Sequence, residues 1–544
     1  MQGFWRRDLL GALRVAGLGA LAAAGLCQLP AAAQAPARNQ IVIMREIDSD
    51  RYDPHRSTAL AAGEVLTLLS DTLVTMDYDM RTIRPGLAER WEVSPDGLTY
   101  TFHLRRDVTF CDGKPFTARD MAFSLNRWIG RTQPRITSPV AWRAGDVKEI
   151  AAVDDFTLRY ELNRPFSELL SQLTLFFAVA IDPATVERLG DNFGVQGFNG
   201  TGPFCWGTWT PRQDMVLSRH ANYRWGPDFY QNRGPAHLER ITWRVVPEAA
   251  SRVAAIQAGQ ADVTQYVPSA FIEPLARVPT IQRLQQPNYF WDVFMGFKVD
   301  KPVVNDVAIR RAVHMAVDRP ALVRAVWAGQ AEPARNIVNP RALDFDEQSD
   351  RLVPGFDRAA AARLLDEAGW RPGPDGVRVK DGQRATFLTY AINTLDNQRM
   401  GEIIQQALRQ VGIEMRIQLF DATVAWGRLA TQEFDAFFLS YPYVSATDAL
   451  NLYWHSRNRP TPNRMNWANP QTDQWLEAGR SALSPEDRAR YAALVQRQLA
   501  EEAPWLTVAR TQLNVFASNR VTGLRAHGLY GAGIYKALDL RTTR

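Results

Sequence analysis

Residues 85 to 125 read PGLAERWEVSPDGLTYTFHLRRDVTFCDGKPFTARDMAFSL, and this stretch says more about the fold than any other part of the chain. After the Asp96-Gly97 turn, apolar and polar residues alternate, so that the apolar side chains share one face of a predicted strand. These apolar residues are Leu98, Tyr100, Phe102 and Leu104. The same alternation returns in Phe156, Leu158, Tyr160 and Leu162. Both segments predict half-buried β-strands of one lobe.

The period of the apolar pattern changes after about residue 302. Apolar residues then recur at helical spacing, in the set Ile309, Ala312, Val313, Ala316 and Val317. A second helix is predicted over residues 359–368, where Gly369 supplies the residue that commonly ends a helix. A helix-rich lobe is therefore expected to begin here.

Within this lobe the pattern predicts a β-α-β-α-β series. The predicted strands cover residues 386–393, 413–419 and 435–441, with helices over 398–410 and through Trp426 and Leu429. Such units form a parallel or mixed sheet with right-handed crossovers, and the ligands of open α/β sheets collect beyond the carboxyl ends of the strands. We therefore expect a ligand cleft lined by the segment that follows Tyr441.

The N-terminus predicts export. Arg6 and Arg7 precede an apolar stretch over residues 9–29 and a run of small residues over 31–35, so residues 1–33 are expected to be a cleaved signal peptide. A retained membrane anchor is disfavoured, because Arg14 and four glycines interrupt the apolar stretch. The adjacent arginines also leave the twin-arginine route open. The expected location is the periplasm.

Composition excludes several other classes of protein. The net charge of the 544 residues is +5, but the arginines are scattered among acids with no basic run, so no nucleic-acid partner is expected. Cys111 and Cys205 are the cysteines beyond the signal peptide, and they are either one disulfide or two unrelated buried thiols. The seven histidines stand singly, with no pair at metal-ligand spacing, so we expect no metal site and no cofactor.

The chain as a whole resembles a known family. The 85–125 stretch is joined by further blocks in the expected order: DPH at 53–55, GTGPF at 200–204, NDVAIRRAVHMAVDRPALVRAVWAG at 305–329, FDRAAAARLLDEAGW at 356–370 and EEAPWLTVA at 501–509. With these blocks the chain resembles the extracytoplasmic solute-binding proteins of the peptide and nickel family, often called family 5. The similarity runs through most of the mature chain.

The resemblance implies an α/β, two-lobed periplasmic-binding-protein fold, type II-like and of cluster C, with an extra subdomain in the first lobe. Lobe I would comprise residues 39–85, 201–300 and 511–544, and the subdomain residues 86–200. Lobe II would comprise residues 301–510, with a hinge near 298–302 and 508–514. Such lobes close over a solute, and the closed form is what a membrane permease recognises.

The resemblance also implies ligand-binding residues. Tyr441 matches an aromatic residue that lines the site in the peptide-binding branch. That branch carries a carboxylate three residues later for the peptide's ammonium group, and the position is Val444 here, so Asp448 is the nearest acid for this role. The other candidates are Thr58, Ala59, Leu60, Tyr443, Arg464, Asn466 and Trp467. For several of them, core packing or a surface turn is an equally good interpretation.

These observations predict a function in transport. We expect a monomeric, non-enzymatic solute-binding component of an ABC importer, which passes a peptide-like or other small organic solute to membrane permease subunits. A binding module for an opine, a sugar, a metal chelate or haem stays open, as does a role in signalling. A periplasmic hydrolase is disfavoured, because the sequence contains neither GxSxG nor HExxH.

Overall fold

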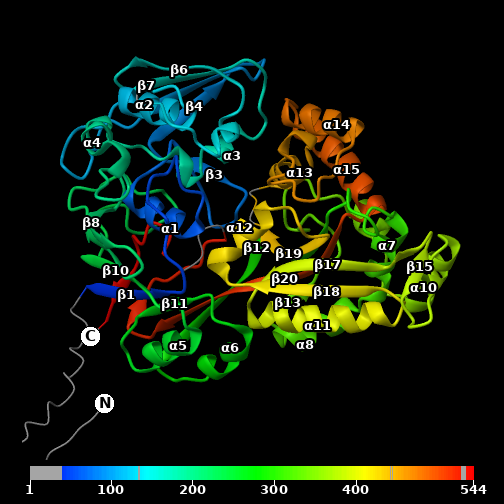
Figure 1. Cartoon of the computed structure of the whole chain (residues 1–544). Helices are drawn as coiled ribbons and strands as arrows, with labels where there is room; N and C mark the ends of the chain where they lie inside the picture. The colour runs from blue at the N-terminus through cyan, green and yellow to red at the C-terminus, as the bar shows by residue number, and fades with distance from the viewer. Residues whose placement is uncertain (1–38, 133–134, 442, 444, 529–533, 544) are drawn as a thin grey trace, which may run out of the picture. The chain divides into compact units, whose positions relative to one another are not determined.

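The computed structural model describes residues 39–132, 135–441, 443, 445–528 and 534–543 (Figure 1). Its centre is one mixed β-sheet of eleven strands, in which helices alternate with strands as the α/β prediction required. In spatial order the strands are β18 (Glu414–Phe420), β17 (Thr386–Ile392), β19 (Ala436–Tyr441), β12 (Ile281–Phe297), β20 (Trp505–Ser518), β11 (Val263–Gln265), β1 (Gln40–Arg45), β10 (Arg240–Val245), β9 (Asp214–Arg219) and β8 (Phe204–Thr210), and β13 (Ala331–Pro333) pairs with β20 off this order.

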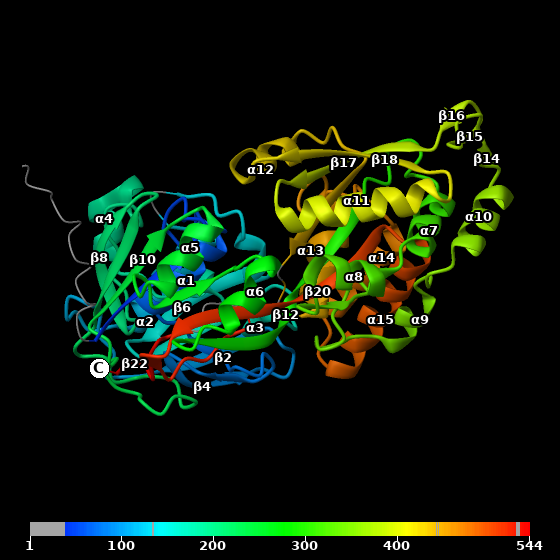
Figure 2. The same cartoon turned by 90° about the horizontal axis from the view of Figure 1, so that it is seen from below.

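Two long antiparallel strands hold the halves of this sheet together. β12 pairs with β20 from the Ile281–Ser518 partners to the Gly296–Trp505 partners, with register shifts between Pro287 and Asp292 and between Val293 and Phe294. Figure 2 shows β20 running from the region of α6 to the region of α8, and both helices pack against it. One hydrogen-bonded sheet therefore runs through the segments predicted as lobe I and lobe II.

The predicted β-α-β-α-β series is confirmed. β17 is parallel to both β18 and β19, and the connections are α11 (Leu395–Arg409) and α12 (Ala422–Ala430). The Thr394 hydroxyl caps α11 by accepting a hydrogen bond from the backbone N–H of Asn397, which explains why the helix begins directly after β17. The carboxyl ends of the three strands therefore lie at one edge of the sheet, as the sequence predicts.

The alternating segments near residue 100 form a separate antiparallel sheet, also as predicted. Its strands, in order, are β4 (Ala88–Val93), β5 (Thr99–Leu104), β7 (Thr157–Leu162) and β6 (Val147–Asp154). The side chains of Phe102, Leu158 and Tyr160 are completely buried on one face, towards α2 (Ala118–Trp128). This sheet belongs to the segment predicted as the appended subdomain.

The other elements surround these two sheets. The short strands are β2 (Val74–Met76), β3 (Ile83–Pro85), β14 (Arg371–Pro372), β15 (Arg378–Lys380), β16 (Gln383–Arg384), β21 (Val521–Thr522) and β22 (Arg541–Thr542). The remaining α-helices are α1 (Leu60–Leu69), α3 (Leu169–Gln172), α4 (Pro183–Leu189), α5 (Ala249–Gln257), α6 (Ser269–Ala276), α7 (Val307–Ala316), α8 (Arg319–Trp327), α9 (Glu347–Leu352), α10 (Arg358–Glu367), α13 (Ala446–Trp454), α14 (Pro470–Arg480) and α15 (Pro485–Glu502). The 3₁₀ turns are η1 (Ala141–Ala144), η2 (Phe176–Ala178), η3 (Gly190–Asn192) and η4 (Ser456–Asn458). The helices predicted from residue 302 onwards correspond to α7 and α10.

A disulfide ties the β4–β7 segment to the large sheet, and a close backbone approach joins the start of β8 to α1. Cys111, in the loop after β5, forms a disulfide with Cys205 in β8, where their Cα atoms lie 5.8 Å apart. The GTGPF block that precedes Cys205 also needs its glycines. A Cβ on Gly202 would come within 2.2 Å of the backbone oxygen of Leu68, at the end of α1. Only glycine permits this close approach of two backbone segments.

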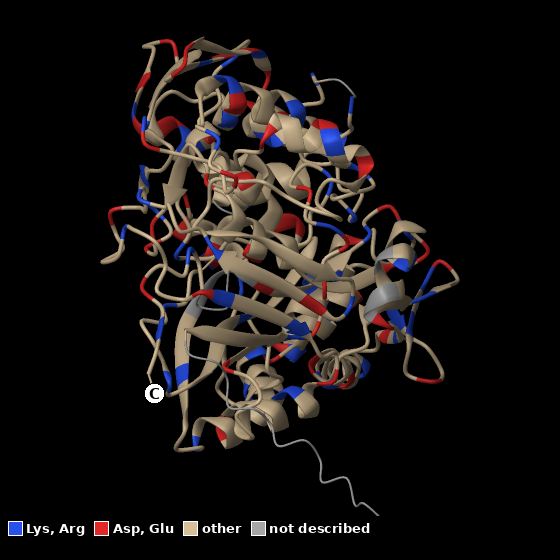
Figure 3. Cartoon of the chain, turned by 90° about the vertical axis from the view of Figure 1, so that its left-hand side faces the viewer, with Lys and Arg blue, Asp and Glu red and all other residues tan. Residues whose placement is uncertain are grey.

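Acidic and basic residues are interspersed along the whole described chain (Figure 3). No helix within the described ranges combines the length and the apolar character needed to cross a bilayer. The predicted signal peptide lies outside the described residues.

Candidate functional site

The segment that follows β19 was the predicted ligand site. β19 ends at Tyr441 and α13 begins at Ala446, with Ser445 as its N-cap. The Ser445 hydroxyl accepts a hydrogen bond of 2.9 Å from the backbone N–H of Asp448, which fixes the first turn of the helix. Val444 lies outside the described residues, and so does the side chain of Tyr441.

Asp448 is bonded by residues from a distant part of the chain. Its side chain is completely buried, and the Arg143 guanidinium in η1 donates a hydrogen bond of 2.8 Å to its Oδ1. Gln172, at the end of α3, donates a further bond of 3.3 Å to the same oxygen and accepts one of 2.7 Å from Arg143. The chain's own arginine therefore neutralises the carboxylate that the sequence suggested as an amine anchor.

Glu168 is a second buried carboxyl group beside Asp448. Its Oε1 accepts a hydrogen bond from the hydroxyl of Ser445, the residue that caps α13. Burial raises the pKa of Glu168 to about 7, and the negative charge of Asp448 adds to this shift. The Ser445 bond and the cations Arg480 and Arg488 act in the opposite direction.

Backbone and aromatic contacts extend this region to α14. The backbone N–H of Ser167 donates a hydrogen bond of 2.7 Å to the carbonyl of Arg480, and the Ser167 hydroxyl donates one of 3.2 Å to the carbonyl of Gly479. The Arg480 guanidinium lies 4.7 Å from the centroid of the Phe166 ring. We call these bonds between residues 142–172 and the region of α13 and α14 the α13 contact. It joins the segment predicted as the subdomain to the segment predicted as lobe II.

Tyr443 connects the same segment to the long central strands. Its hydroxyl accepts a 2.8 Å bond from the N–H of Asn339 and donates a 3.2 Å bond to the Asp292 carboxylate in β12. The Nε of Arg510, in β20, lies 3.2 Å from the other oxygen of Asp292. Burial raises the pKa of Asp292 to about 6, against the opposing charge of Arg510. The buried Tyr443 thus fixes the segment after β19 to β12, near its register shifts.

The three candidates in the loop before α14 have partners of their own. Trp467 is 2% exposed, donates a 2.6 Å bond from Nε1 to Glu502, and packs edge-on against Trp454. Asn466 donates a 2.8 Å bond to Asp300, and Arg464 is buried. For Trp467 the core-packing interpretation describes what the structure shows.

The candidates Thr58, Ala59 and Leu60 lie at the start of α1, where Ala59 occupies the N-cap position. Thr58 is exposed, while Ala59 and Leu60 are half-buried against the main core. Among the hydrogen bonds of the described residues, none joins this segment to α13. The structure therefore does not bring it into direct bonding contact with Asp448.

The DPH block just before it has a structural role that the sequence did not indicate. Arg127 in α2 donates two hydrogen bonds, of 2.8 and 2.7 Å, to the two carboxylate oxygens of Asp53. Arg127 also donates a hydrogen bond of 2.8 Å to Nδ1 of His55. The Nε2 of His55 in turn donates a hydrogen bond of 3.1 Å to the carbonyl of Phe177. Burial lowers the pKa of His55 to about 3, so the imidazole is neutral. The block fixes α2 to the segment between β1 and α1.

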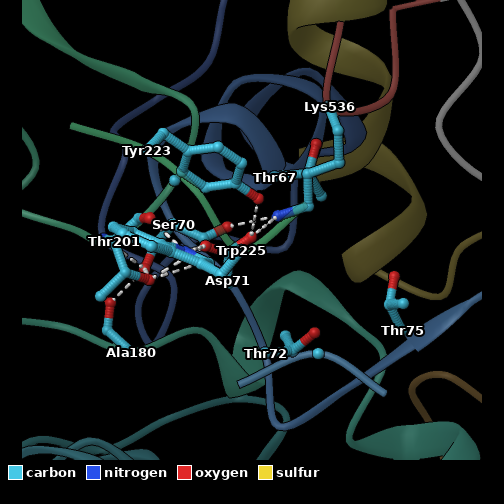
Figure 4. Close-up of polar contacts among 12 residues, drawn as sticks. Thr67, Ser70, Asp71, Thr72, Thr75, Ala180, Thr201, Tyr223, Trp225 and Lys536 are labelled. Carbon is cyan, nitrogen blue, oxygen red and sulfur yellow. Dashed lines mark hydrogen bonds and ion pairs between the residues drawn. The ribbon is translucent and has the colours of Figure 1, made fainter. Parts of the chain in front are cut away.

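Another buried ion pair fixes the C-terminal segment (Figure 4). Lys536 bonds the Asp71 carboxylate and donates a 2.9 Å bond to the carbonyl of Ser70. The Asp71 carboxylate also accepts a 2.9 Å bond from Nε1 of Trp225 and a 3.2 Å bond from the Thr201 hydroxyl. Each charged group is thus compensated within the core, which is the arrangement of a structural tie.

A metal site is not evident in the part of the chain that the structure describes. Cys111, Cys205 and His220 bring possible ligand atoms within 4.8 Å of one another, but both sulfur atoms are bonded in the disulfide. The residues that sequence analysis missed are Arg143, Glu168, Gln172, Asp292 and Arg510. Arg143 and Asp448 are 305 residues apart, so no local pattern could have paired them.

Comparisons with known proteins agree with this architecture. The sequence model of the bacterial extracellular solute-binding proteins, family 5 Middle, matches residues 82–462. The glutathione-binding protein GsiB of Salmonella choleraesuis (strain SC-B67) is 28% identical over 503 residues, which cover 91% of this chain and 93% of that protein.

Solved structures share the fold at lower identity. The oligopeptide-binding protein AppA from Bacillus subtilis, in complex with a nonapeptide, matches with a TM-score of 0.79 and 19% identity, over 93% of this chain and 99% of its own. The periplasmic binding protein DppA from Helicobacter pylori, in complex with the peptide STSA, matches with a TM-score of 0.79 and 22% identity over the same shares. At these identities the likeness establishes the two-lobed α/β fold.

Proposed function

Because the chain belongs to the bacterial extracellular solute-binding proteins of family 5, which serve ABC importers, we propose that it captures a peptide-like or other small organic solute and delivers it to membrane permease subunits. The solute lies in a cleft between the two lobes. Lobe I comprises residues 39–85, 201–300 and 511–544 with its subdomain 86–200, and lobe II comprises residues 301–510.

The observation that carries this proposal is the position of the segment after β19. This segment follows the carboxyl end of β19, at the sheet edge where ligands of open α/β sheets collect. In the same place the α13 contact brings the subdomain against α13 and α14. A solute at this edge is enclosed by both lobes, which is how closure becomes linked to binding.

The ligand site combines side chains at the cleft with side chains that support them. The residues assigned to binding the solute are Tyr441, the segment Thr58–Leu60, Arg464 and Asn466. Tyr443, Asp448 and Trp467 act behind this surface, because their polar atoms bond Asp292, Arg143 and Glu502. Recognition of the solute therefore does not depend on Asp448 as the partner of a ligand ammonium group.

A short peptide of the size of glutathione is the first solute class to test. The relative GsiB is named for glutathione and aligns with nearly the whole chain. A pocket for a short peptide combines apolar walls, which accept different side chains, with a few polar groups that bond the peptide's backbone and charged ends. The protein acts as a periplasmic monomer after a signal peptide over residues 1–33 is removed, with the twin-arginine route as the candidate export path.

The experiment is to purify the mature chain from residue 34, denature it, and identify the released small molecules by mass spectrometry. Isothermal titration calorimetry then measures binding of the recovered compounds, glutathione, dipeptides and longer peptides. Micromolar or tighter binding of a short peptide supports the proposal. A recovered non-peptide solute, with no heat from any peptide, would replace the peptide class. Absence of any binder in both arms would contradict solute capture itself.

A further inference from the structure

The α13 contact extends beyond the ion pair between Arg143 and Asp448. At its outer edge, Leu483 in the loop between α14 and α15 lies against the β4–β5 turn. A Cβ built on Gly97 in that turn would come within 2.6 Å of the Cδ2 of Leu483 and 3.5 Å of Pro165. The subdomain and lobe II thus meet through buried charges at the centre and an apolar contact at the edge.

From this geometry we propose that the subdomain, residues 86–200, is a latch that holds lobe II in the closed state, and that the latch tightens in mildly acidic solution. The inference rests on the proposed function, because it assigns the subdomain a part in closing over the solute. It goes further in that the subdomain's hold on α13 is exerted by the protein's own residues, with no solute required.

The charges at the centre make the latch depend on closure. In the structure the Asp448 side chain is fully buried and that of Arg143 is 10% exposed, so the charge of each side chain offsets the hydration that the other has lost. Gln172 bonds both groups and orients them. When lobe II moves away, Arg143 and Gln172 leave together, because both belong to the subdomain. Opening therefore replaces the hydrogen bonds from Arg143 and Gln172 to Asp448 by hydrogen bonds to water.

Glu168 makes the exchange sensitive to protons. From lobe II it is faced by Asp448 of α13, Arg480 of α14 and Arg488 of α15, and the last of these is itself paired with Asp344. Burial against this set raises its pKa from 4.5 to about 7 in the closed state, while separation of the lobes returns the carboxyl group towards water.

The sign follows from linkage. A carboxyl group whose pKa is higher in the closed state takes up a proton on closing wherever the pH lies between the open and closed values. The contribution to closure is complete below the open value of 4.5 and is lost as the pH rises through about 7. The closing equilibrium is expected to fall about tenfold between pH 6 and pH 8. Acidification therefore favours the closed state.

The test measures the distance between the lobes without any solute. Nitroxide labels are placed through Asp155→Cys in the subdomain and Glu347→Cys in lobe II, because these side chains are 52% and 81% exposed and take no part in the latch. Double electron–electron resonance then gives the closed fraction from pH 5 to pH 8. The latch predicts a short-distance population that grows as the pH falls.

Two variants and a control decide the outcome. Glu168→Gln keeps a hydrogen-bonding group for Ser445 but cannot titrate, so the pH dependence should disappear. Arg143→Gln strands Asp448, so the closed fraction should fall at every pH, and adding Asp448→Asn should restore part of it. The control Glu149→Gln removes an exposed carboxylate of β6 and should change nothing. Melting temperatures confirm that each variant is folded.

The proposal is overturned if the closed fraction of the parent protein does not change with pH, or if Glu168→Gln retains the same pH profile. Equal closed fractions in the parent and in Arg143→Gln would also overturn it. A solute panel with no binder would count against the proposed function and leave this distance measurement intact. A binder found alongside a pH-independent closed fraction would do the reverse.

Discussion

Arg143 donates a hydrogen bond of 2.8 Å to Asp448, although 305 residues separate the two in the chain. Because this bond and that of Gln172 engage the same carboxylate oxygen, the acid nearest to the predicted amine-binding position is compensated by the protein itself. This relationship changes what a mutation at Asp448 is expected to do.

We expect Asp448→Asn to weaken the binding of a peptide with a free amine and of its N-acetylated form by the same factor, to within about twofold. The substitution alters the α13 contact, which both kinds of peptide use equally. Calorimetric titration of one peptide in its free and capped forms, against the parent and the variant, measures the ratio. A loss confined to the free-amine peptide would show that Asp448 binds the ammonium group directly.

Lys536→Met is expected to lower the free energy of unfolding by about 3–5 kcal/mol, because it leaves the Asp71 carboxylate buried without its cation. The double variant Asp71→Leu with Lys536→Met should lie much closer to the parent protein, since no charge is then stranded. Urea unfolding at pH 7 measures both. Arg159→Gln, which breaks the exposed pair with Glu149, is the matched control and should cost at most about 1 kcal/mol. Equal losses in the single and double variants would contradict this account.

Gly202→Ala should destabilise the protein by about 1–3 kcal/mol or more, because its Cβ would overlap the backbone at the end of α1. Gly355→Ala is the comparison, since a Cβ there meets no atom within 4 Å. Thermal unfolding of the two variants separates a close backbone approach from the general effect of replacing glycine. A Gly202→Ala protein as stable as the Gly355→Ala protein would refute the explanation given for the GTGPF block.

Stability should fall in acid, partly through His55. Its imidazole is neutral in the fold, with a pKa of about 3 against an ordinary value of 6.5, so the unfolded chain binds a proton first as the pH falls. Its contribution is complete above pH 6.5 and is lost below it, by up to about 1.4 kcal/mol per pH unit. In urea unfolding at pH 6, 5 and 4, the free energy of unfolding should decline less steeply with falling pH for His55→Gln than for the parent protein. Parallel declines would assign the acid sensitivity to other groups.

Sequence could predict the parts of this fold that depend on the periodicity of apolar residues within a short window. The alternation from Leu98 to Leu104 and the β-α-β-α-β pattern from residue 386 to 441 each lie within a short window, and both were found where expected. The carboxyl ends of those strands then gave the prediction of where the site region lies. Asp448 became a candidate through the family resemblance, as the nearest acid after the position that Val444 occupies.

The roles within the site required partners that no local pattern contains. Asp448 acquires its role from Arg143, and Tyr443 acquires its role from Asp292, which lies 151 residues earlier. The DPH block was recognised as a motif, yet its function of bonding Arg127 depends on the packing of α2. Such pairings arise only when the chain is folded, because burial and not sequence distance decides which charges must be compensated.

The order of strands in the large sheet also determines when each strand can pair during synthesis. β1, at Gln40–Arg45, pairs only with β10 and β11, about two hundred residues later, and β11 finds its other neighbour in β20 near the end of the chain. β1 therefore stays unpaired until residues 240–265 have been made, and the sheet is completed only when β20 follows near the end of the chain. Pairings of such long sequence separation form slowly. Until β20 is complete, one edge of β11 therefore lacks its partner strand, and this is the interval in which chaperones can hold the chain.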